Sequence, residues 1–295
     1  MRRTGSRPGW WLLFAALVGL MVVIAACSDD DDDEEDGGDD GSPTAAAGKI
    51  DISSVPELDD GTLLVGSDIA YPPIEFFEEG TDTPTGLDVD LMNAMGVAMG
   101  VDVEFTQVAD FAGIVGDLTS ERYDVVMSAI SITPEREAEI DFVPYFGPAG
   151  TGILVQAGNP DGIASIEDLC GKAVGAQVGT FQVEQMTGFN AAECADNPID
   201  IKEYPDNPAS VEDLKLGRTA AQLSDDPVAA YAALLSDELL EVTVTGFDSA
   251  PYGIGVRKDS TELRGVLEEA LAAIKKDGTY DSILADWGQE ALALD

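Results

Sequence analysis

Arg136 stands in a sequence context that is typical of an anion-binding side chain. Thr133 and Pro134 have the residue types of a helix N-cap and a first helical position, which places Arg136 in the first turn of a helix. A cation there opposes the helix dipole at a cost of roughly 0.3 to 1 kcal/mol. An arriving anion that shares the guanidinium with the helix amides offsets this cost. A surface salt bridge is the alternative explanation for Arg136.

Asp225 is the second charged residue whose position suggests ligand chemistry. It comes after a predicted strand and before Asp226 and Pro227. Because proline favours the first position of a helix, Asp226 is predicted to be the N-cap, which leaves the carboxylate of Asp225 available to a cation. The alternative is that Asp225 is a second capping acid.

Alternating strands and helices must position these two residues. The hydrophobic pattern predicts strands at 62–66, 101–105 and 123–127, helices at 88–99 and 111–119, and a helix starting at 133. A second series has strands at 152–156, 173–177, 199–204, 219–224 and 241–244, and helices near 166–169, 182–187 and 208–216 and from 227. This order predicts the α/β class with mostly parallel sheets.

The chain is predicted to fold into two lobes. The strand at 252–256 and the helices at 261–276 and 280–287 would return to the first lobe. Lobe I then comprises residues 59–149 and 250–295, and lobe II comprises 150–249. The chain crosses between them near 147–152 and 246–253, where glycines are predicted to bend as a hinge. A ligand would lie in the cleft between the lobes.

The first 58 residues differ from the rest of the chain. Three arginines and an uncharged run that ends at Ala26 have the outline of a secretion signal, residues 1–26, and its roughly 17 apolar residues are short for a membrane helix. Ile24-Ala25-Ala26-Cys27 resembles the lipobox of bacterial lipoproteins, which implies lipidation of Cys27. The acidic run at 29–40 lies in a segment, 27–58, that is predicted to be a flexible tether rather than a metal-binding tail.

The composition excludes several classes of function. Of the 15 basic residues three lie in the signal, and of the 57 acidic residues ten lie in the acidic run, which leaves a net charge of about −35 on the remainder. Such a field repels nucleic acid. Histidine is absent, which argues against zinc sites and histidine catalysis, and no metal or cofactor is expected. In an exported protein Cys170 and Cys194 are predicted to form a disulfide.

Several ordered motifs between residues 63 and 287 resemble those of the family 3 extracellular solute-binding proteins of bacteria. The segment 86–91, Gly-Leu-Asp-Val-Asp-Leu, is similar to the start of the family signature, and Asp88 within it is predicted to cap a helix. Further matches are Ser67 to Pro73, Ile130 to Arg136, Val178-Gly179-Thr180, Asp225 to Val228 and Lys276 to Tyr280. The resemblance implies the two-lobed fold of periplasmic binding proteins and the binding of a free amino acid.

The same resemblance implies how the charged ends of the amino acid are held. Arg136 would bind the α-carboxylate and Asp225 the α-ammonium. Thr180 matches a backbone and hydroxyl donor of the second lobe. The loop that meets both ends of the ligand is matched by Ser128, Ala129 and Ser131.

The resemblance also implies which residues surround the ligand's side chain, but it leaves some of their roles open. Tyr71 and Phe111 match aromatic residues on either side of it, although Phe111 could equally be a core residue. Asp68 matches an acid at its polar end. Phe181 departs from the small residues usual in the family, which leaves the side-chain preference open. Gln177 could face the pocket or the solvent.

These expectations describe reversible capture rather than catalysis. The resemblance implies delivery of the amino acid to the membrane permease of an ABC importer. Lipidation of Cys27 would anchor the protein, which is expected to be a monomer, to the outer face of the cell membrane. The alternatives are a dehydratase of the prephenate or arogenate type, with Asp68 or Asp225 as the acid or base, and an amino-acid-sensing lipoprotein.

Overall fold

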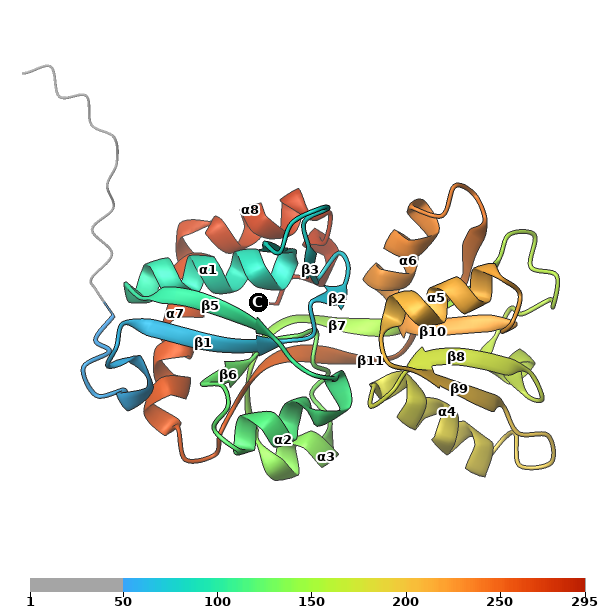
Figure 1. Ribbon diagram of the computed structural model, residues 1–295, viewed down its shortest axis with the longest axis horizontal. Coiled ribbons are helices and arrows are strands. Elements are labelled where there is room, and N and C mark those ends of the chain that lie inside the picture. The colour runs from blue at the N-terminus through green and yellow to red at the C-terminus, as the bar shows by residue number, and fades with distance from the viewer. Residues whose placement is uncertain (1–49, 295) are drawn as a thin grey trace, which may run out of the picture. The chain divides into compact units, whose positions relative to one another are not determined.

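A computed structural model describes residues 50–294, and an eight-stranded sheet runs through both lobes (Figure 1). Its strands are β1 (Thr62–Ser67), β5 (Asp102–Gln107), β6 (Val125–Val126), β7 (Asp141–Gln156), β8 (Ala173–Gln177), β9 (Asp200–Tyr204), β10 (Ala221–Asp225) and β11 (Leu240–Val256). Their order across the sheet is β5-β1-β6-β11-β7-β10-β8-β9. The outer strands of each lobe pair in parallel, whereas the long central strands β7 and β11 pair antiparallel with each other and with their neighbours. The predicted α/β class is confirmed.

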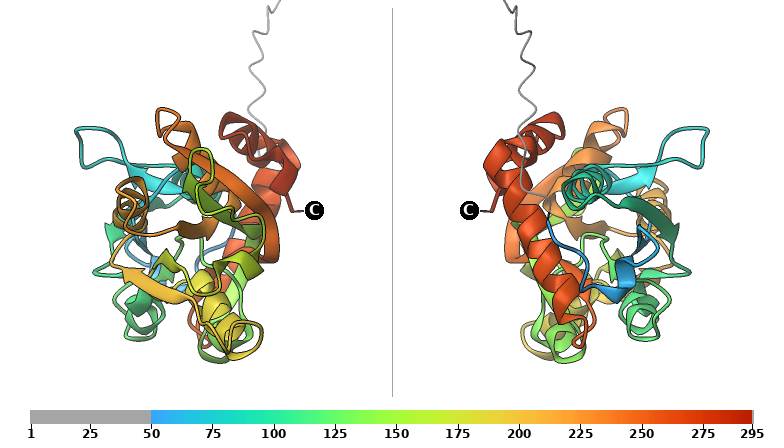
Figure 2. Two further views of the ribbon diagram at one scale, coloured as in Figure 1. Left: turned by 90° about the vertical axis from the view of Figure 1, so that its right-hand side faces the viewer. Right: turned by 90° about the vertical axis from the view of Figure 1, so that its left-hand side faces the viewer.

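Helices pack on both faces of the sheet in each lobe (Figure 1). Those of lobe I are α1 (Leu87–Met99), α2 (Ile114–Thr119), α3 (Pro134–Glu139), α7 (Thr261–Asp277) and α8 (Thr279–Asp286). Those of lobe II are α4 (Phe181–Ala191), α5 (Asn207–Lys215) and α6 (Asp226–Leu234). Four 3-10 turns, at Pro56–Leu58, Phe111–Gly113, Ile166–Leu169 and Glu290–Leu292, and a small sheet of β2 (Ala70–Tyr71), β3 (Glu75–Phe77) and β4 (Pro84–Thr85) complete the elements described. The C-terminal helices, red in Figure 2, pack in the same core as α1 and β1.

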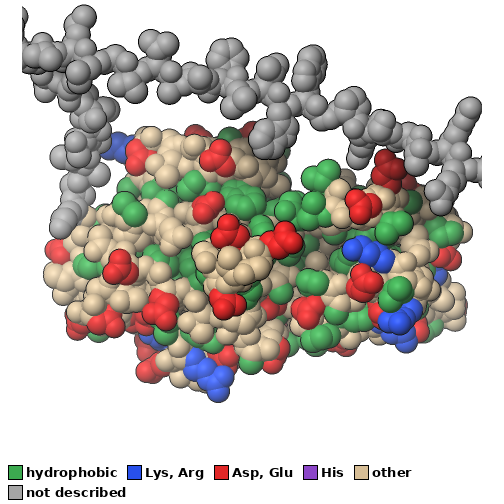
Figure 3. Space-filling model, turned by 45° about the horizontal axis from the view of Figure 1, so that its top comes forward, with side chains coloured by type: hydrophobic (Ala, Val, Ile, Leu, Met, Phe, Trp, Pro, Cys, Tyr) green, Lys and Arg blue, Asp and Glu red, His purple; other side chains and the backbone are tan. Residues whose placement is uncertain are grey.

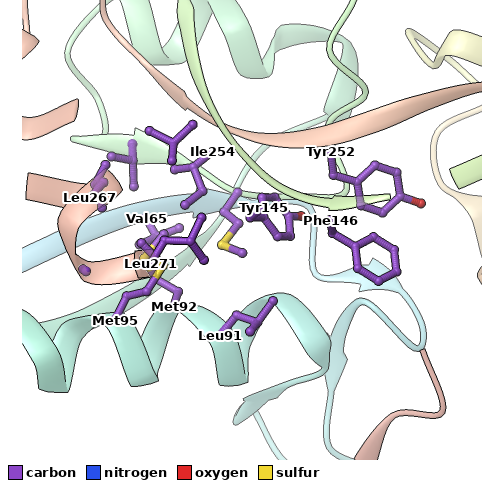
Figure 4. Close-up of a cluster of buried hydrophobic side chains, with 14 of the residues drawn as sticks. Val65, Leu91, Met92, Met95, Tyr145, Phe146, Tyr252, Ile254, Leu267 and Leu271 are labelled. Carbon is purple, nitrogen blue, oxygen red and sulfur yellow. The ribbon is translucent and has the colours of Figure 1, made fainter. Parts of the chain in front are cut away.

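The core of lobe I lies between helices α1 and α7 and the sheet. Leu91, Met92 and Met95 of α1 are fully buried, and Figure 4 shows them beside Leu267 and Leu271 of α7. The 3.6-residue spacing of these side chains explains why the segment forms a helix with one apolar face. Gly100, in the left-handed conformation, ends α1.

Asp88 does not cap α1, so that prediction is wrong. Gly86 holds the N-cap position with φ of 129°, and a Cβ there would lie 2.3 Å from the carbonyl oxygen of Ile74, so only glycine fits. Asp88 is instead fully buried and accepts hydrogen bonds from the Tyr145 hydroxyl at 2.6 Å and the Ala129 N–H at 3.0 Å. Through the Ala129 N–H, the carboxylate therefore holds the loop after β6 in place.

Asp226 is also not a helix cap. The N-cap position of α6 belongs to Asp225, whose side chain makes no capping bond, and Asp226 is the first helical residue. The Oδ2 atom of Asp226 accepts the N–H of Gly246 at 2.7 Å. The prediction was one residue out of register, because either of two adjacent acids before a proline satisfies the capping rule.

The two crossings between the lobes are neighbouring strands rather than loops. Strands β7 and β11 carry the chain across, with Ala149 opposite Ala250 and Thr151 opposite Phe247, and the register of the pair shifts repeatedly between them. The glycines of 147–152 and 246–253 lie on these two strands.

Two features outside the sheet bear on the sequence predictions. The disulfide between Cys170 and Cys194 is confirmed, with its Cα atoms 5.3 Å apart. Val55 and Leu58, assigned above to the tether, are buried in the core of lobe I. The predicted signal, Cys27 and most of the predicted tether lie outside the described residues. No helix within residues 50–294 is long and apolar enough to cross a membrane.

Candidate ligand-binding site

A cavity lies where the two lobes meet. All eleven predicted ligand-binding residues line it: Asp68, Tyr71, Phe111, Ser128, Ala129, Ser131, Arg136, Gln177, Thr180, Phe181 and Asp225. Two further residues, Glu75 and Gln182, line it without having been predicted. The topology explains this convergence, because residues that follow strand ends in both lobes face the same cleft.

Arg136 projects from the start of α3 and spans the cleft. The Thr133 hydroxyl accepts the N–H of Arg136 at 3.3 Å, which confirms the predicted cap. The guanidinium donates to the carbonyl oxygen of Ser131 at 2.8 Å and, across the cleft, to that of Gly179 at 3.0 Å. It also lies over the ring of Phe111, 5.5 Å from its centroid. Both hydrogen-bond partners are neutral carbonyls, so the guanidinium has no hydrogen-bonded carboxylate among the described residues. Burial lowers the pKa of Arg136, and the nearby acids Glu184, Asp225 and Glu135 partly offset this effect.

Asp225 is the counterpart of Arg136 on lobe II. It ends β10, is 5% exposed, and accepts hydrogen bonds from the Tyr71 hydroxyl at 3.1 Å and Gln182 Nε2 at 2.8 Å. The Tyr71 hydroxyl in turn accepts the N–H of Asp225 at 3.0 Å, which joins the lobes. Burial raises the pKa of Asp225 to about 6, because these donors only partly replace water around the carboxylate.

Asp68 forms a second link between the lobes, at the end of β1. Its carboxylate accepts hydrogen bonds from Gln107 Nε2 at 2.8 Å and from Gln177 Nε2 of lobe II at 2.5 Å. Gln177 is 3% exposed, so its side chain faces the cavity rather than the solvent. The Thr180 hydroxyl donates to the backbone carbonyl of Gln177 at 2.7 Å and fixes the turn before α4. Burial raises the pKa of Asp68.

Glu75 is a buried acid that the sequence analysis missed. It is 1% exposed, and its Oε1 accepts the Ser128 hydroxyl at 2.8 Å, whereas Oε2 has no hydrogen-bond partner among residues 50–294. Burial raises the pKa of Glu75 well above its ordinary value, and the nearby Asp88 adds to this effect. The available signal was an acid four residues after Tyr71 inside the apolar run of β3.

The loop after β6 holds the remaining predicted residues in place. The Ser128 hydroxyl also accepts the N–H of Asp68 at 3.0 Å, and Ala129 adopts a left-handed φ of 45°. Ser131 forms a bridge with Tyr252 of β11. The loop is thereby anchored to the strand that leads into the hinge.

The walls and charges of the cavity define what it can hold. Phe111 is 9% exposed and both packs in the core and lines the cavity, so the two explanations offered for it are compatible. Three carboxyl groups and one guanidinium line the cavity. Such a site suits a small ligand with one carboxylate and an excess of cationic or hydrogen-bond-donating groups. No cluster of three or more potential metal ligands occurs in the described part of the chain.

Known proteins resemble the chain over most of its length. The model of the family described as "Bacterial extracellular solute-binding proteins, family 3" matches residues 63–290. The L-cystine-binding protein TcyJ of Escherichia coli (strain K12) is 32% identical over 228 residues, which cover 77% of this chain and 82% of that protein. An ancestral arginine-binding protein bound to arginine is 38% identical with a TM-score of 0.71, over 77% of this chain and 98% of that chain.

A third similar protein is the ancestral amino acid-binding protein AncCDT-1, described as a precursor of cyclohexadienyl dehydratase. It is 34% identical with a TM-score of 0.70, over 78% of this chain and 97% of that chain. Proteins named for binding amino acids and one named as the precursor of an enzyme therefore share this fold.

Proposed function

Since the chain belongs to family 3 of the bacterial extracellular solute-binding proteins, we propose that it captures a free amino acid between its lobes for an ABC importer. The membership also confirms the expected two-lobed α/β fold. The observation that carries the proposal is the pairing, in one cavity, of a guanidinium that is hydrogen-bonded only to carbonyl oxygens with a buried carboxylate on the opposite lobe.

The two ends of an amino acid match these groups. The α-carboxylate would be held by Arg136, and the α-ammonium by Asp225, where it would compensate a carboxylate that now lies buried with neutral donors. Contacts from both lobes to one ligand favour the closed arrangement, because each lobe gains its contacts only when the cleft is shut. Thr180 of lobe II would also meet the charged end of the ligand, and Gln177 and Phe181 would then lie beside its side chain.

The side chain of the ligand ends in a cation or another hydrogen-bond donor under this proposal. Asp68 and Glu75 remain once Asp225 is assigned to the ammonium, and Glu75 Oε2 still lacks a donor within the described residues. Arginine satisfies both acids, and the ancestral protein solved with arginine is 38% identical. L-cystine, whose second ammonium could serve the same acids, is the other candidate, named for TcyJ.

A thermal-shift panel tests this function. The twenty amino acids, ornithine and L-cystine are added singly, and a ligand at a hundred times its dissociation constant adds about 2.7 kcal/mol of stability. We expect the largest shift with arginine and none with aspartate or glutamate. If none of these compounds shifts the melting temperature, the amino-acid proposal is wrong.

The enzyme alternative rests on the buried acids and on AncCDT-1. Glu75 and Asp225, whose pKa values burial raises, are groups that could transfer protons to a bound substrate. We propose reversible binding instead, because the chain belongs to a family of solute-binding proteins, and neutral donors hold Asp225 and one oxygen of Glu75. Incubation with prephenate or arogenate, followed by ultraviolet detection of the aromatic product, should show no turnover.

We further propose that Cys27 is lipidated and anchors the protein to the outer face of the cell membrane. The support is the lipobox-like sequence that ends the apolar run, together with the extracellular character of the family. The acidic tether would then hold the binding lobes near a permease, which raises the local concentration of captured ligand there.

A further inference from the structure

The two lobe-crossing strands approach each other unusually closely at two glycines. A Cβ on Gly150 of β7 would lie 2.4 Å from the Cα of Gly246 on β11, and a Cβ on Gly152 would lie 2.8 Å from the Cβ of Ala229 in α6. Both contacts are shorter than side-chain atoms allow. These glycines are therefore needed for close packing against each other and against lobe II, which is a different use from flexibility.

Asp226 occupies the junction that this close packing creates. Its Oδ2 accepts the Gly246 N–H at 2.7 Å, and a Cβ on Gly150 would lie 2.8 Å from the same oxygen. One side chain of α6 thus bonds one crossing strand and packs against the other. It directly follows Asp225, the residue at the ligand end of β10.

A second set of contacts reaches the crossing from α4. Gln182 Nε2 donates to Asp225 Oδ1 at 2.8 Å and to the Thr151 hydroxyl of β7 at 3.2 Å. Thr151 donates onward to Gln185 Oε1 at 2.7 Å, and Gln185 Nε2 donates to the backbone carbonyl of Asp248 on β11 at 3.2 Å. Asp248 has a left-handed φ of 45°, a conformation that Asp adopts more readily than most residues.

We propose that Asp226 and Gln185 clamp the lobe II ends of both crossings, so that the lobes rotate about a shorter hinge on the lobe I side. Residues 150–152 and 246–248 then move with lobe II as one body, and the change of backbone angles is confined to 147–149 and 249–250, because Pro251 and Gly253 are hydrogen-bonded to the lobe I loop. Gly147, with φ of 101°, lies in this part, and a Cβ there would lie 2.7 Å from the backbone nitrogen of Ala149. The hinge predicted from the sequence included every glycine of the two crossings, so the proposed hinge is shorter than the predicted one.

The clamp gives Asp226 and Gln185 a positioning role in ligand capture, and this role rests on the proposed function. Neither residue lines the cavity, yet each is tied to Asp225, Asp226 through the chain and Gln185 through Thr151 and Gln182. A loosened clamp would let lobe II close in several orientations. The fraction of molecules that present Asp225 correctly would fall, and the apparent affinity would fall with it.

Hydrogen exchange and calorimetry on the full chain test the clamp. In Asp226→Ala we expect exchange of the Gly246 amide, measured without ligand, to rise about tenfold and L-arginine affinity to fall about tenfold, as loss of one hydrogen bond to a charged acceptor predicts. Asp226→Asn should restore most of both, because its amide oxygen still accepts. Glu193→Ala, an exposed lobe II acid that is not in these contacts, serves as the matched control.

The outcomes separate the clamp from the proposed function. If exchange at residues 246–248 is unchanged in Asp226→Ala, or if Asn behaves as Ala does, the clamp is wrong. If the unmodified protein binds no amino acid, the binding proposal fails alone, and the exchange measurement still decides the clamp. Should Asp226→Ala not fold, Gln185→Ala must raise exchange around Asp248 for the clamp to stand.

Discussion

At the scale of single residues, the charges of the cavity are unbalanced before any ligand arrives. Asp68, Glu75 and Asp225 are buried acids with raised pKa values, and Arg136 is the only basic residue among those that line the cavity. Burial disfavours each ionised acid, and hydrogen bonds from amides and hydroxyls only partly compensate. A cationic ligand would restore the balance, so its binding should be linked to the protonation of these acids.

Affinity should therefore fall as the pH falls through about 6. In the empty protein Asp225 has a pKa of about 6 and must be ionised to pair with an ammonium, so below that pH binding must first remove a proton. Calorimetry with L-arginine should show a loss of up to about tenfold per pH unit below this value. Asp225→Asn should bind weakly and with a flatter pH profile. Equal affinity at pH 5 and pH 7 would contradict the role of Asp225.

The same raised pKa has a consequence for stability in the absence of ligand. The folded pKa of about 6 exceeds the ordinary value of 3.8, so between these values the folded state binds more protons than the unfolded state. The penalty from Asp225 is absent below about pH 4, grows through this window and is complete above about pH 6. Asp225→Asn should unfold at a higher temperature than the unmodified empty protein at pH 7, as differential scanning calorimetry can measure.

Arg136 can be tested separately from folding. Arg136→Ala should weaken amino-acid binding by at least about thirtyfold, the usual effect of truncating one partner of a buried charge pair. Its melting temperature without ligand should stay close to that of the unmodified protein, because the guanidinium bonds only carbonyl oxygens. Arg136→Lys keeps the charge but not the two-pronged geometry and should fall between. Unchanged affinity in Arg136→Ala would refute the carboxylate contact.

Residues at element ends were predictable from sequence, and those inside elements were less so. Arg136 comes three residues after the helix cap Thr133, and Asp225 lies two residues before Pro227. Both are local signals of a helix start, which place these residues at the end of an element. Asp88 and Glu75 lie within or beside apolar runs, and their partners are 57 and 53 residues away in the sequence. Such long-range partners leave no local pattern, which is why one was misjudged and the other missed.

At the scale of elements, the positions of strands and helices were largely predicted, but the length of the two crossing strands was not. The glycines and prolines at 147–152 and 246–253 resemble loop residues, so the sequence predicts breaks there. In the structure β7 and β11 continue through them, because each supplies the other's hydrogen-bond partners and register shifts absorb the irregular residues. Only the pairing of segments a hundred residues apart could have revealed this.

The disulfide should stabilise lobe II. It joins the turn after Ile166–Leu169 to the segment after α4, and Cys194 is buried in the core of that lobe. Closing a loop of this length, with a sequence separation of 24, restricts the unfolded chain and contributes about 3 kcal/mol. The Cys170→Ala, Cys194→Ala double variant should lose that much in urea unfolding. A difference below about 0.5 kcal/mol would contradict the estimate.

At the scale of the whole molecule, the excess of acidic over basic residues dominates the electrostatics. The full chain carries a formal net charge of −42, and Figure 3 shows acidic side chains spread over the face in view with basic ones at few places. Mutual repulsion of these carboxylates destabilises the folded state, and the nine ion pairs among the described residues are mostly exposed and weak.

Stability should rise with salt for this reason. The screening length falls from about 30 Å at 0.01 M to about 3 Å at 1 M, so the repulsion is largely removed over that range. The melting temperature should increase steadily with potassium chloride, and a matched sucrose series accounts for effects other than screening. A melting temperature that falls on adding salt would show that specific ion pairs outweigh the repulsion.

The path of the chain through the crossing has one more consequence. Ala149 and Ala250 lie opposite each other on neighbouring strands, so the hundred residues between them leave lobe I and return to it at a single place. Lobe II is therefore one continuous segment of the chain, and its two connections to lobe I lie next to each other. A gene segment encoding 150–249 could be exchanged with that of a relative, which would replace Gln177, Phe181 and Asp225 together with both halves of the clamp while Arg136 stayed behind. New ligand preferences could then arise by recombination of whole lobes as well as by point substitution.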